Sequence, residues 1–153
     1  MMAKDPTYVA LNHDVLLEVL QRQTSTSMID HPVVDRAVRV CHTLILSTDL
    51  QKGYERAIPN GLGILVGPFQ RFGQMLTGLG YGHKFKIDRK SRWKEGPVRG
   101  LKAKHKEIVL GALAVRATYL ISNWSPPEKL ALGIRERGLI VLSPEDYLRV
   151  VGE

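Results

Sequence analysis

Two patterns of hydrophobic positions alternate along the chain. The first consists of four short apolar runs, rich in β-branched and aromatic residues, at Tyr8–Asn12, Leu44–Leu46, Thr118–Ser122 and Leu139–Leu142. These runs do not alternate with polar residues, which is typical of strands that are buried on both faces. We therefore predict four short buried strands.

Between these runs, apolar residues recur at the spacing of helices. The predicted helices start at Asp14 and Pro32, follow Ser47 through Ala57, cover Phe69–Leu79 and Glu107–Val115, run from Ser125 to near Gly138, and run from Ser143 through Val151. Ser125 and Ser143 are each followed by proline and then an acid, which predicts an N-cap at both serines. Cys41 falls on the apolar face of the helix that starts at Pro32, and we expect it in the core.

Buried strands that alternate with helices predict an α/β fold: a central, mostly parallel sheet of four to five short strands with helices on both faces. The length of 153 residues is that of a single domain. Ligands of such sheets bind beyond the carboxyl ends of the strands. The segments expected at those ends are Asn12–Asp14, Ser47–Asp49 and Ser122–Trp124.

The excess of positive charge is confined to one segment. The net charge is +7, and ten basic and two acidic residues give Lys84–Lys106 a charge of +8, which leaves −1 for the rest. Basic residues interleaved with Tyr81, Phe85 and Trp93 are suited to RNA, because cations pair with phosphates and aromatic rings stack on bases. The alternative is a solvated loop that Phe85 and Trp93 anchor to the core. The candidate RNA-binding residues are Lys84, Lys86, Arg89, Lys90, Arg92, Trp93, Lys94, Arg99, Lys102 and Lys104.

Other features exclude several classes of protein. The single cysteine cannot form an internal disulfide or a cysteine-based zinc site. The longest uncharged run, Ala57–Gln70, is too short for a membrane span and contains two prolines. The first residues lack the apolar core of a secretion signal. We therefore expect a cytoplasmic protein without a membrane partner.

Three segments resemble the PIN-domain family, whose members are metal-dependent nucleases and include many toxin ribonucleases. Within His105–Val151, a buried helix and the strand Tyr-Leu-Ile-Ser precede a helix and then Gly-Leu-Ile-Val-Leu-Ser-Pro-Glu-Asp-Tyr-Leu, as PIN domains commonly end. Tyr8–Leu17 and Leu46–Ala57 are similar to the family's first strand and turn and its second strand and helix. The resemblance implies one PIN-like three-layer domain over residues 1–153, with a basic insertion at about 80–106.

The resemblance also implies a cluster of carboxylates that holds Mg²⁺ or Mn²⁺ at the strand ends. At the corresponding positions this chain has Asn12, Gly53, His105 and Trp124. Ser122 keeps the expected hydroxyl, and Asp14 is the one carboxylate near an expected place. His13 and His105 could also meet at the strand ends, a weaker hypothesis of a transition-metal site.

These observations leave three hypotheses. In the first, the domain is catalytically degenerate, needs no cofactor, and binds RNA or a ribonucleoprotein through the basic segment. In the second, acids such as Asp49, Glu55 and Glu107 act with Asp14 in a Mg²⁺- or Mn²⁺-dependent toxin-type ribonuclease that has an antitoxin-like partner. In the third, it is a protein–protein adaptor whose basic segment meets an acidic partner. The family resemblance also suggests a homodimer.

Overall fold

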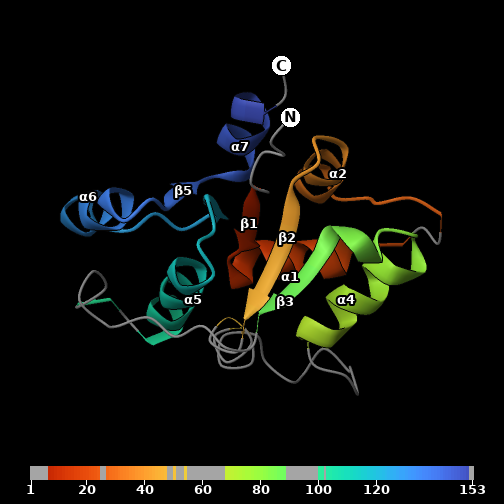
Figure 1. Cartoon of the computed structure of the whole chain (residues 1–153), viewed down its shortest axis with the longest axis horizontal. Helices are drawn as coiled ribbons and strands as arrows, with labels where there is room; N and C mark the ends of the chain where they lie inside the picture. Colours follow the sequence, from red (N-terminus) through yellow and green to blue (C-terminus); the bar gives the residue numbers. More distant parts are fainter. Residues whose placement is uncertain are drawn as a thin grey trace, which may run out of the picture.

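Five parallel strands form the centre of the molecule (Figure 1). The computed structural model describes residues 7–24, 27–47, 50, 54, 68–88, 100, 101 and 103–151. The strands are β1 (Tyr8–Leu11), β2 (Thr43–Ser47), β3 (Phe85–Asp88), β4 (Tyr119–Ile121) and β5 (Ile140–Leu142), in the order β3-β2-β1-β4-β5. Every neighbouring pair is parallel, which confirms the predicted α/β class with its parallel sheet.

Helices cover both faces of this sheet. They are α1 (His13–Arg22), α2 (Pro32–Arg39), α4 (Pro68–Gly78), α5 (Ala103–Ala114), α6 (Glu128–Glu136) and α7 (Pro144–Val151), and the short 3-10 helix η2 is Gly82–Lys84. Phe85 of β3 packs edge-on against Phe72 of α4, with ring centroids 5.6 Å apart. Ser47 of β2 points to the opposite face, because Leu44 is in register with Phe85 and side chains alternate along a strand. There Ser47 approaches Gly111 of α5, so α4 and α5 lie in different layers.

The strand order reverses at the middle of the sheet. The chain adds β2 and β3 on one side of β1 and then places β4 and β5 on the other side. The carboxyl ends of β1 and β4 are therefore neighbours, and the backbone N–H of Asn12 donates a hydrogen bond of 2.8 Å to the carbonyl of Ile121. Such a switch point is where α/β proteins form their ligand sites.

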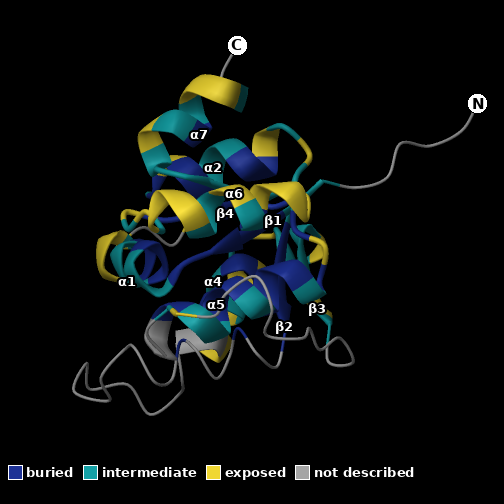
Figure 2. Ribbon diagram, turned by 90° about the vertical axis from the view of Figure 1, so that its left-hand side faces the viewer, coloured by how far each residue is buried: buried dark blue, intermediate teal, exposed yellow. Residues whose placement is uncertain are grey.

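The core lies between the sheet and the inner faces of the helices, as the dark blue segments of Figure 2 show. Val9, Ala10 and Leu11 of β1 are buried together with Leu16 and Val19 of α1 and with all three apolar residues at the centre of β2. None of the helices within the described ranges is long and apolar enough to cross a membrane.

Strand β3 lies within the basic segment, where no strand was predicted. It was missed because its sequence, Phe-Lys-Ile-Asp, alternates apolar and charged residues, unlike the continuous apolar runs of the other strands. This alternation suits an edge strand with one face against a helix. Phe85 anchors it to the core, as the loop alternative expected of this side chain.

Two local predictions were wrong and one is confirmed. Helix α6 starts at Glu128, later than expected from Ser125, and Pro127 takes its N-cap position. Cys41 is exposed, because α2 ends at Arg39 and Cys41 adopts a left-handed φ of 62° beyond it. Ser143 caps α7 as predicted, since its Oγ accepts a hydrogen bond of 3.1 Å from the Asp146 N–H. Most of the helix predicted after Ser47 lies outside the described residues.

The close packing of α5 on the end of β2 depends on Gly111. A Cβ at this position would lie 2.7 Å from Leu50 Cγ and 2.8 Å from Leu50 N, too near for any real contact. Overpacking of this kind costs about 1–3 kcal/mol, which exceeds the gain of up to about 1 kcal/mol that alanine brings over glycine in a helix. We expect Gly111→Ala to lower the free energy of unfolding in urea titrations.

Gly133→Ala is the matched control. Gly133 lies in α6, and a Cβ there would meet no heavy atom within 4 Å. Alanine should therefore raise the free energy of unfolding by up to about 1 kcal/mol. Equal stabilisation by both substitutions would mean that α5 does not approach Leu50 as described.

Candidate functional site at the carboxyl edge of the sheet

A buried hydrogen bond joins the ends of β1 and β4. Asn12 is 1% exposed, and its Nδ2 donates to Ser122 Oγ over 2.8 Å. The same hydroxyl oxygen accepts a hydrogen bond of 2.9 Å from the backbone N–H of Trp124. Asn12 and Ser122 thus hold the two strand ends together and fix where Trp124 leaves the sheet.

Two aromatic rings stack beside this hydrogen bond. The rings of His105 and Trp124 are parallel within 2°, with centroids 3.8 Å apart. The His13 ring lies 5.8 Å from the His105 ring, and His13 Nδ1 is 3.1 Å from Asn12 Oδ1. A continuous set of contacts therefore runs from Ser122 through Asn12, His13 and His105 to Trp124. We call these five residues the edge cluster.

The edge cluster contains four of the positions singled out by the family resemblance: Asn12, His105, Ser122 and Trp124. Asn12 and Ser122 are 110 positions apart in the sequence, and the structure brings all four residues to one place. Gly53 lies outside the described residues, but the hydroxyl of the adjacent Tyr54 donates to the Leu11 carbonyl over 2.5 Å. The fifth member is His13, the first residue of α1, and its ring lies near that of His105, as the weaker hypothesis of a transition-metal site expected.

Asp14 has a structural role next to the edge cluster. Its Oδ1 accepts from the Val15 N–H over 2.7 Å, and its Oδ2 accepts from the Asn123 N–H over 3.1 Å. Burial raises the pKa of the Asp14 carboxyl, and these backbone hydrogen bonds and the nearby His13 partly oppose that rise. The side-chain amide of Asn123 also donates to Glu18 Oε1 over 2.8 Å. Two acids of α1, Asp14 and Glu18, thus hold the segment that follows β4.

The edge cluster does not fit the Mg²⁺ or Mn²⁺ that the family resemblance implies. These ions prefer several anionic oxygen ligands. The cluster offers an amide, a hydroxyl, two imidazoles and an indole, and both oxygens of the adjacent Asp14 already accept backbone hydrogens. Within the described parts of the chain, no three His, Cys, Asp or Glu residues are grouped so that they could hold a metal ion. Glu107 lies on α5 two residues after His105, while Asp49 and Glu55 fall outside the described residues.

The described residues on both sides of positions 89–102 lie at the carboxyl edge of the sheet, where the edge cluster is. Strand β3 is parallel to β2, so it ends with Asp88 at the carboxyl edge. Helix α5 starts at Ala103, and its third residue, His105, belongs to the edge cluster. Arg89, Lys90, Arg92, Trp93, Lys94, Arg99 and Lys102 lie outside the described residues, as does the side chain of Lys104.

Lys84 and Lys86 are the two candidate RNA-binding cations whose side chains lie within the described residues. Lys84 ends η2 and precedes β3, so it is at the amino edge of the sheet. Lys86 is exposed in the middle of β3, where its Nζ is 3.2 Å from the Tyr8 hydroxyl and 5.2 Å from the centre of that ring.

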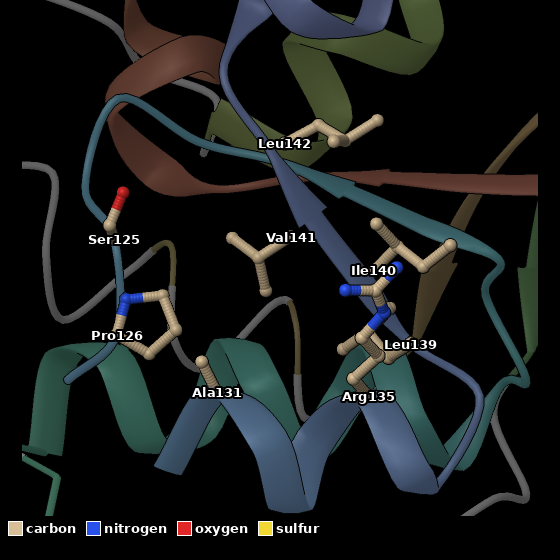
Figure 3. A pocket seen from close by; sticks show the side chains of 8 residues that line it. All are labelled: Ser125, Pro126, Ala131, Arg135, Leu139, Ile140, Val141 and Leu142. Carbon is tan, nitrogen blue, oxygen red and sulfur yellow. The ribbon is translucent and has the colours of Figure 1, made fainter. Parts of the chain in front are cut away.

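A hollow of about 340 Å³ lies between β5 and α6 (Figure 3). Ile140, Val141 and Leu142 form one side of it, and Arg135 of α6 supplies its cation. Ser125 and Pro126 close the end opposite Arg135. The hollow is mainly apolar and contains none of the residues that the sequence singled out as candidate site residues.

Comparison with known proteins finds no matching family model, no matching curated protein and no matching solved structure.

Proposed function

We propose that this chain is a catalytically degenerate, PIN-like domain that binds RNA at the carboxyl edge of its sheet. One observation carries the proposal. The described residues on both sides of positions 89–102 lie at this edge, Asp88 at the end of β3 and Ala103 at the start of α5. The densest run of cations in the sequence is thus attached, at both of its ends, to the edge where α/β sheets bind ligands.

The chemistry of the cations favours a polyanion as ligand. Arg89, Lys90, Arg92 and Lys94 fall within six residues around Trp93. Lysine and arginine pair with phosphates and release counterions, and an indole stacks on an unpaired base. RNA offers both groups along one strand, whereas an acidic protein partner offers only the charges.

The edge cluster supports binding without catalysis. Metal-dependent hydrolysis of RNA needs a cation that activates water and stabilises charge on the phosphate. The side chains at this edge instead contact one another, through the Asn12–Ser122 hydrogen bond and the His105–Trp124 stack. We therefore assign the edge cluster the role of a rigid base that holds the start of α5, where the basic segment ends.

The proposal is tested with a fluorescently labelled single-stranded RNA and protein freed of nucleic acid by a high-salt wash. Anisotropy should report binding whose affinity falls steeply with salt, with a log–log slope of roughly −3 if about four cations touch phosphates. Gels run after incubation with Mg²⁺ or Mn²⁺ should show intact RNA. RNA affinity that does not depend on salt would contradict the proposal that the cations of the basic segment bind the phosphates. Cleavage that disappears in an Asp14→Ala or Glu107→Ala variant would support the ribonuclease instead.

A further inference from the structure

Strand β3 forms one outer edge of the sheet and presents an apolar side chain there. Within the described residues, β2 is the one strand that pairs with β3. Ile87 is 40% exposed, although Phe85, two residues earlier on the same face, packs on α4. A groove of about 640 Å³ runs between α4 and these two side chains. A sheet edge of this kind can accept another strand.

We propose that β3 pairs antiparallel with β3 of a second copy of this chain about a twofold axis, with Ile87 opposite Ile87. Pairing of this kind would join the two five-stranded sheets into one. The proposal is independent of RNA binding, because it uses the face and strand edge of β3 rather than the residues that follow it.

The charges on β3 select this register over its neighbours. Directly opposed residues in an antiparallel pair point to the same face of the sheet, and a twofold axis normal to the sheet keeps each residue on its own face. Opposed residues must therefore be an even number of positions apart in the sequence, so the axis passes beside one residue, which faces its own copy. Centring on Lys86 or on Asp88 would place like charges opposite each other, which destabilises a strand pair. Centring on Ile87 places Lys86 opposite Asp88 of the second copy, twice by symmetry, and brings the two isoleucines together.

The groove leaves room for Ile87 of the second copy on the face of β3 that packs against α4. Gly73, Thr77 and Gly78 line its helix side, and Phe85 and Ile87 line its strand side. Small residues on α4 allow an apolar side chain from a neighbouring strand to approach, so Ile87 of the second copy can be covered there. The Lys86 side chain leans over Tyr8 in the single chain, and because it is exposed it can turn to the opposed aspartate.

Sedimentation velocity of the full chain, freed of nucleic acid and measured over a hundredfold range of concentration, tests the proposal. Wild type should pass from monomer to dimer. Asp88→Lys and Lys86→Asp each place like charges opposite each other and should weaken the dimer at least tenfold. The double variant Lys86→Asp/Asp88→Lys restores the opposite charges and should dimerise within about threefold of wild type.

Glu145→Lys, an exposed charge reversal on α7, is the control and should leave the dimer unchanged. Melting temperatures of all variants separate a lost dimer from a lost fold. Three results would overturn the proposal. They are a wild-type monomer at every concentration, a dimer affinity that neither single charge reversal changes, or a folded double variant whose dimer affinity is as low as that of the single variants.

Discussion

Replacement of Arg89, Lys90, Arg92 and Lys94 by glutamine should weaken RNA binding by about a hundredfold near physiological salt. Each phosphate contact on a single strand contributes about 0.7 to the log–log salt slope, so four contacts account for roughly two orders of magnitude in affinity at about 0.15 M salt. The log–log salt slope should become less negative, from roughly −3 toward zero, in the same anisotropy titration. The melting temperature should stay near that of wild type, because the substitutions leave the edge cluster and the described core unchanged.

A control variant separates this effect from a general loss of positive charge. Arg39, Lys129, Arg137 and Arg149 are exposed on the described helices and their ends, away from the basic segment. Their replacement by glutamine lowers the net charge by the same amount, but it should change affinity only by the weak long-range field. Equal losses in the two variants would mean that net charge, and not the basic segment, governs binding.

The substitution Asn12→Asp should destabilise the fold without creating a metal site. Asn12 is 1% exposed and donates its amide hydrogen to Ser122, a bond that a carboxylate cannot donate. Burial of a carboxylate costs several kcal/mol, which a hydrogen bond donated by the Ser122 hydroxyl offsets only in part. We expect a loss of about 2–4 kcal/mol in the free energy of unfolding at neutral pH. Urea titrations at several pH values measure this loss.

The pH dependence identifies the buried charge as the cause. Burial raises the pKa of the introduced carboxyl above its unfolded value of about 3.9. The folded chain then binds a proton that the unfolded chain has lost, so stability falls as pH rises from about 4 toward the folded pKa. Asn12→Leu removes the same hydrogen bond without adding charge. It should show no such change relative to wild type over that range, because the raised pKa of Asp14 contributes to both chains.

Calorimetry with Mn²⁺ completes this comparison. In the Asn12→Asp variant, the introduced carboxylate and that of Asp14 would lie near a stacked imidazole–indole pair, which is still too few oxygen ligands for a tight site. We expect no affinity tighter than roughly millimolar in wild type or in the variant, by the ligand-count argument for hard cations. Micromolar affinity in the variant would show that the edge cluster is a metal site that lacks a single ligand.

Strands β1, β2 and β4 could be predicted because burial on both faces leaves a direct trace in the sequence. Strand β5 is a half-buried edge strand, and it could be predicted because its three residues are all apolar. The apolar runs around Val9, Leu44, Leu120 and Val141 all became strands of one parallel sheet. Parallel order then placed Asn12 and Ser122 at strand ends on the same edge from the sequence alone. Strand β3 was missed because only one of its faces is apolar, and its lysine and aspartate resemble loop residues when they are read alone.

Other features depend on packing that no local pattern records. The stack of His105 on Trp124 requires α5 to approach the end of β4, and the close contact of Gly111 with Leu50 helps to set the position of that helix. Cys41 follows an apolar helix face but lies past the end of α2, because the chain turns there with a positive φ. Asp14 was a candidate metal ligand only under the ribonuclease hypothesis. In the structure its oxygens accept hydrogen bonds from the backbone N–H groups of Val15 and Asn123.

Ultraviolet cross-linking of the wild-type chain to a uridine-containing single-stranded RNA, followed by mass-spectrometric mapping of the linked peptides, tests the proposed function most directly. It reports both whether RNA is bound and where it lies. The proposal predicts adducts within residues 89–105 and on the peptide that contains Trp124, and these adducts should diminish in high salt. Adducts confined to α2, α6 or α7, or no adducts at protein concentrations well above those needed in the anisotropy titration, would contradict it.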